Sequence, residues 1–156
     1  MKLRVICVGR VKERFVQEGI AKYLRFIGRY ADVEIRDVKD EKVTDLKDAP
    51  LIRRREQERI NRAVPPDAFV IALDERGQEL TSHEFAALLV GLKEKGIRDL
   101  AFVIGGPLGL DEAVTKRADK TLAVSRWTFT HEMARLVLLE QLYRAFTIIT
   151  GKTYHY

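Results

Sequence analysis

Residues 100–109 read Leu-Ala-Phe-Val-Ile-Gly-Gly-Pro-Leu-Gly, a short apolar run that ends in a cluster of glycines. The continuous apolar part predicts a buried strand over 100–104. A second run of this kind spans 68–73 and is followed at 74–77 by Asp-Glu-Arg-Gly, which predicts a turn. Strands that are apolar on both faces are typical of parallel sheets with helices on each side. These two runs therefore predict an α/β fold.

The remaining segments alternate between strand-like and helix-like patterns. We expect further strands at 3–9, 33–38 and 122–129, and helices at 15–30, 46–63, 82–95 and 131–150, with a short helix beginning at Asp111. This alternation predicts a mainly parallel sheet with helices on both faces. Since no linker, repeat or low-complexity segment interrupts the chain, we expect a single domain over 1–156. Ligands of such sheets bind beyond the carboxyl ends of the strands, which places a candidate site at the loops after Leu73, Ile104 and Val124.

The composition argues against several classes of protein. With 46% hydrophobic and 33% charged residues, the chain suits a globular protein rather than a disordered one. Cys7 is the only cysteine, so neither an intrachain disulfide nor a cysteine metal site can form, and its apolar neighbours predict a small buried side chain. No apolar stretch approaches the roughly 18 residues of a membrane span, and no signal-peptide pattern is present. We expect a cytoplasmic protein without a membrane or metal partner. The net charge of +5 permits a polyanionic partner such as RNA without requiring one.

The predicted helix at 131–150 is apolar on nearly every side. At 100° per residue, its leucines, aromatic residues and other apolar side chains point almost all round the axis, so the helix must be covered on most sides. One side can pack on the sheet. A second copy of the chain is the simplest cover for the other, and we expect a homodimer. The alternative is a helix buried under the N-terminal helices of its own chain.

Three local patterns each allow two interpretations. The glycines at 105–109 let the backbone approach a flat or anionic ligand, but an ordinary tight turn explains the same pattern. The arginine-rich segment at 53–62 is either a solvated helix face or a contact for an RNA backbone. The closing residues Tyr154 and His155 either fray, as chain ends do, or fold over a pocket.

Motifs in the second half of the chain together resemble one family. They are the run FVIGGPLGL at 102–110, LAVS at 122–125, TFTH at 128–131, Arg135 with EQLYRA at 140–145, and the pair Tyr154-His155. In order and spacing, and with the opening strand and the chain length, they resemble the small SPOUT methyltransferases that methylate N3 of a pseudouridine in 23S ribosomal RNA. The chain departs from the family at Thr130 and Thr153, where many relatives have proline, and at Tyr156, where the last residue is commonly basic.

The resemblance implies an active enzyme with a defined set of partners. It implies a trefoil knot in the C-terminal part, a homodimer with its active sites at the interface, the ribosome with its 23S rRNA as substrate, and S-adenosylmethionine as the methyl donor. The donor-binding residues that it implies are Leu73, Gly105, Val124, Ser125, Arg126, Trp127, Thr128 and Phe129. The catalytic residues that it implies are His131, Arg135, Tyr154 and His155.

The chemistry suggests a role for each catalytic candidate. Methyl transfer from a sulfonium is a direct displacement, so the enzyme mainly aligns the nucleophile with the methyl group. The imide N3 is protonated at neutral pH, and His155 or His131 could accept its proton. Arg135 could stabilise negative charge on a neighbouring carbonyl oxygen, and Tyr154 offers a ring for base stacking. A non-catalytic RNA- or nucleotide-binding module and a nucleotide-dependent enzyme of small molecules are the rival interpretations.

Overall fold

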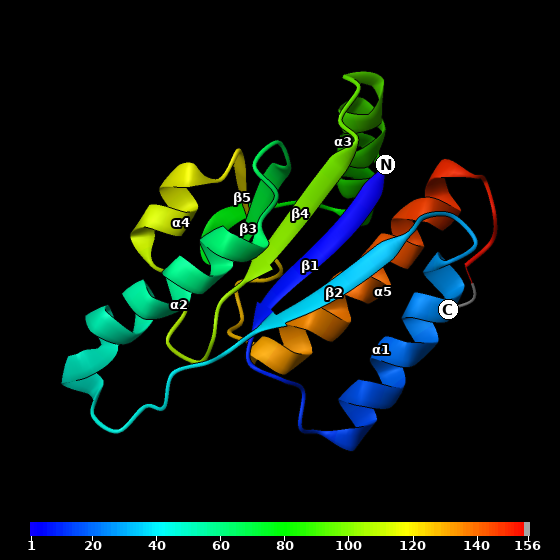
Figure 1. The fold of residues 1–156 in the computed structure, drawn as a ribbon. Coiled ribbons are helices and arrows are strands. Elements are labelled where there is room, and N and C mark those ends of the chain that lie inside the picture. Colours follow the sequence, from blue (N-terminus) through cyan, green and yellow to red (C-terminus); the bar gives the residue numbers. More distant parts are fainter. Residues whose placement is uncertain (155–156) are drawn as a thin grey trace.

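A computed structural model describes residues 1–154 of the chain as one parallel sheet between two layers of helices (Figure 1). The elements in chain order are β1 (Lys2–Val8), α1 (Arg14–Ile27), β2 (Val33–Val38), the 3₁₀ helix η1 (Leu46–Asp48), α2 (Ala49–Ala63), β3 (Phe69–Glu79), α3 (Ser82–Glu94), β4 (Asp99–Ile104), α4 (Glu112–Arg117), β5 (Lys120–Ala123) and α5 (His131–Ile149). The strands lie in the order β2-β1-β4-β3-β5, and each neighbouring pair is parallel. The predicted α/β class is confirmed.

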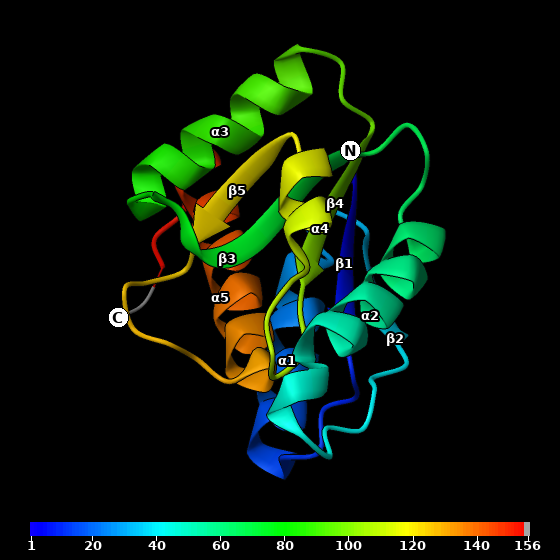
Figure 2. The same ribbon diagram turned by 90° about the vertical axis from the view of Figure 1, so that its left-hand side faces the viewer.

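The centre of the sheet is apolar on both faces, as the runs at 68–73 and 100–104 require. Helices α1, α3 and α5 cover one face, where Ile27, Phe85 and Leu139 join the side chains of the strands in one core (Figure 2). Helices α2 and α4 cover the other face, where Ile60 and Val114 belong to a second core. The prediction of helices on both faces is therefore confirmed. The trefoil knot stays a prediction.

The turn expected at 74–77 is wrong. Strand β3 runs on to Glu79, and its pairing with β5 shifts register between Leu73 and Gln78. Gly77 permits this because a Cβ there would lie 2.5 Å from the carbonyl carbon of Leu122, too close for any side chain. The Asp-Glu-Arg-Gly sequence thus forms a bulge within β3, because β5 pairs with β3 on both sides of it. The local sequence alone does not reveal this pairing.

The strand expected at 122–129 is also too long. Strand β5 ends at Ala123, and residues 124–130 form a loop that leaves the sheet. Two helix starts also differ from expectation. The segment at 46–63 divides into η1 and α2, and the side chain of Thr81, not Ser82, caps α3 by accepting a hydrogen bond from the N–H of Glu84.

Helix α5 lies between α1 and α3 and packs against both. Leu139 and Leu142 are fully buried inside the one chain, so they face its own core. Burial by neighbouring helices of the same chain, α1 among them, therefore accounts for much of the apolar surface of α5. The homodimer stays a prediction. None of the helices within residues 1–154 combines the length and apolarity needed to cross a membrane.

Candidate functional site

A cleft of about 1110 Å³ opens beyond the carboxyl ends of β4 and β5 and beside the bulge of β3. The lining residues are Glu13, Arg53, 73–76, 104–110, Glu112, Val124, Ser125, 127–132 and Ala134. Of the three loops expected to form a functional edge, those after Ile104 and Val124 line this cleft, whereas the residues after Leu73 line it as the bulged part of β3 and not as a loop. In Figure 2 the loop after β4 and the loop before α5 approach each other below the sheet. Parallel strands deliver their following loops to one edge, so this convergence is a consequence of the topology.

The glycine turn after β4 closes tightly on itself. The N–H of Gly109 donates to the carbonyl oxygen of Gly106 at 2.9 Å, and Gly109 has a φ of +78°. A Cβ on Gly105 would lie 2.7 Å from the carbonyl carbon of Gly109, so the turn leaves no room for a side chain there. The bare Cα at Gly105 is thus required by the turn's own backbone. The folded turn presents its backbone to the cleft.

The loop at 124–130 forms the opposing wall. The N–H of Trp127 donates to Ser125 Oγ at 3.0 Å, and Thr128 Oγ1 donates to the Glu75 carboxylate at 3.3 Å. These two bonds tie the loop to itself and to the β3 bulge. The Trp127 side chain is 80% exposed, although the residue lines the cleft.

Most of the expected donor-binding residues meet in this cleft. Leu73 and Gly105 stand on one side and the loop at 124–129 on the other. Within the described chain, Arg126 is the one donor-binding candidate that does not line the cleft. Its guanidinium pairs with Glu79 at 3.1 Å and is otherwise open to solvent. The role of the expected donor-binding residues stays a prediction. Their position in the cleft supports it for all of them except Arg126.

His131, the first residue of α5, lies half-buried in the wall of the cleft. Burial lowers its pKa below the ordinary 6.5, and the charge of Arg135 acts in the same direction, whereas the charge of Glu132 opposes it. A histidine with a lowered pKa is neutral at pH 7 and has a ring nitrogen that can accept a proton. The position and the charge state of His131 therefore suit a base.

Arg135 is 2% exposed and does not line the cleft. Its Nη1 donates to the Asp37 carboxylate at 2.8 Å, and its Nη2 donates to the carbonyl oxygen of Gly9 at 2.9 Å. Its Nε is buried and has no hydrogen-bond partner within the described part of the chain. The guanidinium thus faces the protein interior, beneath the His131 turn. Cys7, in the same region, is fully buried as expected, and burial raises the pKa of its thiol to about 12.

Tyr154 lies at the other end of α5. Its ring packs edge-on against Tyr143 with 5.1 Å between centroids, and the guanidinium of Arg144 lies over it at 4.2 Å. Its hydroxyl is 3.3 Å from that of Tyr23 on α1, and burial raises its pKa. Figure 1 shows this red C-terminal segment beside α1. Tyr154 does not line the cleft of its own chain, and His155 lies outside the described residues.

Several cleft residues could not be singled out from the sequence. Asp74 was expected in a turn, yet it lines the cleft, and a hydrogen bond from Arg76 lowers its pKa. Its place directly after a buried strand was the available signal. Arg53, from the basic segment, also lines the cleft, and its guanidinium donates to the Leu108 carbonyl at 3.4 Å. Among residues 1–154, no group of three or more His, Cys, Asp or Glu side chains could hold a metal ion.

Known proteins are similar in sequence to this chain over nearly its whole length. The family described as "Predicted SPOUT methyltransferase" matches residues 1–155. The ribosomal RNA large subunit methyltransferase H of Geobacter sulfurreducens is 47% identical over 156 residues, which cover 100% of both chains. The protein of that name from Bifidobacterium adolescentis is 44% identical, and the match covers 99% of each chain.

Solved structures share the fold at much lower identity. A probable methyltransferase from Bordetella pertussis Tohama I has a TM-score of 0.55 at 15% identity, covering 92% of this chain and 95% of that one. A probable methylase family protein from Haemophilus influenzae Rd KW20 has a TM-score of 0.54 at 16% identity, covering 99% of this chain and 70% of that one. The family match and the curated relatives confirm the resemblance carried by the motifs: the chain belongs to the SPOUT methyltransferase family.

Proposed function

We propose that this protein transfers a methyl group from S-adenosylmethionine to N3 of a pseudouridine in 23S ribosomal RNA, in the cytoplasm. The observation that carries the proposal is the cleft between the glycine turn and the loop at 124–130, with His131 in its wall. A relative that is 47% identical over the full length is named ribosomal RNA large subunit methyltransferase H, which supports both the reaction and the class of substrate.

The cleft suits the proposed donor in size and charge. About 1110 Å³ slightly exceeds the upper end of the range usual for small-molecule sites. Apart from the buried Glu132, whose carboxylate is bound to backbone N–H groups, its lining carries four carboxylates against two arginines, and an excess of carboxylates favours a ligand with a sulfonium and an ammonium group. Backbone of the glycine turn offers a flat surface for the adenine, and Leu73 with the apolar members of the opposing loop covers it. When bound, S-adenosylmethionine supplies an electrophilic methyl group.

The chain's own residues then align and deprotonate the nucleophile. His131 is neutral at pH 7 and accepts the N3 proton, which leaves the nitrogen lone pair free to attack. His155 is the second candidate for this base. The guanidinium of Arg135 is hydrogen-bonded to Asp37 and Gly9 and is not directed at the cleft, so its expected contact with a substrate oxygen has no support in the geometry of one chain.

A homodimer reconciles the C-terminal residues with the cleft. Tyr154 does not line the cleft of its own chain. A symmetric pair in which the tail of one chain reaches the cleft of the other places Tyr154 and His155 at the reacting base. Tyr154 then stacks on a nucleobase, and phosphates of the RNA contact both subunits, each with a net charge of +5.

A methylation assay with labelled donor tests the proposal. Intact ribosomes, free large subunits and naked 23S rRNA are compared, and the modified nucleoside is identified by mass spectrometry. We expect a methyl group on N3 of a pseudouridine in at least one of these substrates. Donor binding without any transfer to rRNA would indicate a non-catalytic module. Transfer only to small molecules would indicate the other rival class, and either result contradicts the proposal.

A further inference from the structure

The first turn of α5 carries two buried charges, Glu132 and Arg135, that have no direct part in the proposed reaction. Glu132 is 9% exposed and Arg135 is 2% exposed. A buried charge is costly unless it is hydrogen-bonded to partners of suitable geometry. The two side chains are three positions apart, yet the hydrogen bonds of each go to segments more than 90 residues away. Their partners therefore show which parts of the fold they join.

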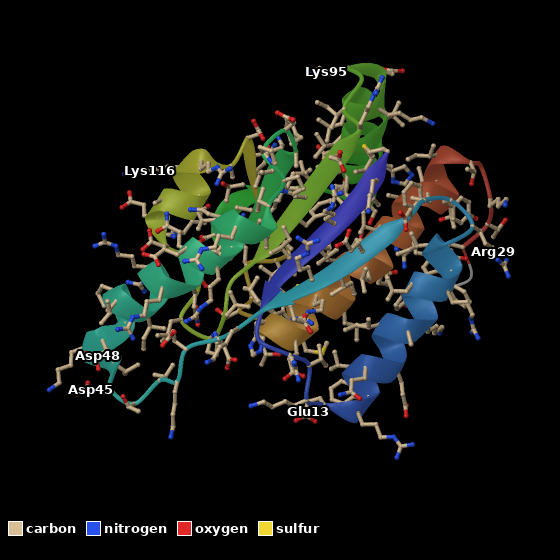
Figure 3. The ribbon with its side chains drawn as sticks, viewed as in Figure 1. Glu13, Arg29, Asp45, Asp48, Lys95 and Lys116 are labelled. Atoms are coloured by element: carbon tan, nitrogen blue, oxygen red, sulfur yellow. The ribbon has the colours of Figure 1, made fainter. Side chains whose placement is uncertain are left out.

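Glu132 binds the segment that leads into α1. Its Oε2 accepts hydrogen bonds from the N–H groups of Lys12 and Glu13, each at 3.1 Å. Glu13 is the N-cap of α1 and makes no capping bond with its own side chain. A carboxylate near a helix N-terminus is favoured by the helix dipole as well as by these bonds. Figure 3 labels Glu13 where the loop after β1 enters α1, close to the first turn of α5.

Arg135 binds the other end of the same segment. Its Nη2 donates to the carbonyl oxygen of Gly9, the first residue after β1, and its Nη1 donates to Asp37 near the end of β2. Residues 9–13 are thus held at Gly9 by Arg135 and at Lys12 and Glu13 by Glu132.

His131 lies directly against the segment that these bonds hold. A Cβ on Gly9 would be 3.5 Å from His131 Nε2, and Gly9 has a φ of +80°, which L side chains rarely adopt. The bare Gly9 therefore forms one side of the space that the imidazole occupies. The orientation of the ring depends on where this segment lies.

We propose that Glu132 and Arg135 are positioning residues, which fix residues 9–13 beside His131 and thereby hold its imidazole at the cleft. The inference deepens the proposed function and rests on it, because the ring matters only if it takes part in methyl transfer. It replaces the expected contact of Arg135 with substrate by an action through His131. A misplacement of about 1 Å at a reacting group can cost about 100-fold in rate, so such a clamp has a measurable effect.

Single-turnover methylation at saturating donor, with donor affinity from calorimetry, measures the effect. Glu132→Ala removes the hydrogen bonds to the N–H groups of Lys12 and Glu13, and Glu132→Gln keeps an amide oxygen that can accept them. Arg135→Lys keeps the positive charge but lacks the two guanidinium nitrogens that bind Asp37 and Gly9. Glu18→Gln is the matched control, because Glu18 lies exposed on α1 in an ion pair with Arg14. We expect Glu132→Ala and Arg135→Lys to lower the rate about 10- to 100-fold at unchanged donor affinity, and Glu132→Gln to retain more. Glu18→Gln changes neither quantity.

Two further measurements distinguish a positioning role of Glu132 and Arg135 from a general effect on stability and from a purely electrostatic effect on His131. Amide exchange at Lys12 and Glu13, and the imidazole resonances of His131, report directly on the clamp, and both should change in Glu132→Ala. The charged groups that act on His131 are Glu132, Arg135, Asp40 and Lys12. Glu132→Ala removes a charge that acts on the ring, whereas Arg135→Lys keeps its charge, so a purely electrostatic role would change the rate in the first variant and leave it nearly unchanged in the second. Positioning predicts that both variants are slower.

The outcomes are distinguishable from failure of the proposed function. Normal single-turnover rates in folded, donor-binding Glu132→Ala and Arg135→Lys would overturn the inference, and so would loss of donor binding in both. If Glu132→Ala does not fold, Glu132→Gln and Arg135→Lys decide the matter by the same criteria. A wild-type protein that methylates no rRNA would instead remove the proposed function, and with it this role. The exchange and imidazole measurements would then still show whether the clamp exists.

Discussion

The two ends of α5 lie in different surroundings. His131 begins the helix in the wall of the cleft, whereas Tyr154 follows its last turn and packs on α1. Tyr154 packs against Tyr143, and the helical rise places Tyr143 about 18 Å along α5 from His131. Residues expected to act on one base therefore lie far apart within a single chain. In the proposed homodimer, the C-terminal end of a second copy would complete the site at the N-terminal end of α5.

Two pairs of charged residues on α5 also differ in how far along the chain their partners lie. Glu132 and Arg135 bind segments near the N-terminus of the chain, while Glu140 and Arg144 bind each other at 2.7 Å on the helix surface. The first pair joins separate parts of the fold, and the second is a local i,i+4 pair of the kind that stabilises helices slightly. Substitutions near the two ends of α5 should consequently differ in their effects on donor binding, methylation rate and stability.

The largest effect is expected from damage to the cleft itself. Gly105→Val puts a side chain where a Cβ alone would lie 2.7 Å from the backbone of Gly109, so the glycine turn cannot keep its shape. We expect donor binding to fall below detection by calorimetry while circular dichroism still shows a folded protein. Gly91→Ala is a control at a distant glycine of α3 whose added Cβ meets nothing within 4 Å. Unchanged donor affinity in Gly105→Val would contradict the assigned cleft.

A change at the other end should leave donor binding intact. Deleting residues 154–156 removes Tyr154 and His155, and we expect methylation of ribosomes to fall at least about 100-fold, the low end for loss of acid–base help. Donor affinity should stay the same, because the tail does not line the cleft of its own chain. Single-turnover assays give the rate. Near-normal turnover would show that the tail has no part in the reaction.

The pH dependence sharpens the assignment of the base to the cleft end. Burial lowers the pKa of His131 below 6.5, and a base works only when it is deprotonated. The single-turnover rate should therefore rise with pH to a midpoint below 6.5 and be level above about pH 7. In His131→Ala this rise should be absent. A midpoint well above 6.5 that survives the substitution would assign the base elsewhere.

The smallest expected effect is on stability. Glu140→Gln weakens a surface pair with Arg144 and should cost about 0.5 kcal/mol of unfolding free energy. Glu132→Gln weakens two charge-assisted bonds to backbone N–H groups and should cost about 1–2 kcal/mol. Urea unfolding compares the two variants with wild type. Equal costs would remove the distinction between the long-range pair and the local one.

The sequence predicts the fold where periodicity and burial agree. The buried strand over 100–104 and the alternating strand over 33–38 are both present, because the first run is too short for a helix and the second repeats with the period of two that a strand requires. The bulge at Gly77 could not be predicted, since it depends on the backbone of Leu122 in a strand far along the chain. For the same reason the motifs placed Gly105 and His131 near a site but gave Arg135 a substrate contact. Its actual partners, Gly9 and Asp37, are fixed only when the N-terminal strands pack beneath α5.

Subunit complementation tests most directly whether the two ends of α5 act together across a dimer. A His131→Ala chain with an intact tail is mixed with a chain that lacks residues 154–156 but keeps His131, and mixed dimers are confirmed by native mass spectrometry. Each mixed dimer then holds one complete site, so random exchange should restore about one quarter of wild-type activity from two nearly inactive parents. A mixture no more active than its parents, although mixed dimers have formed, would contradict a site shared between two chains.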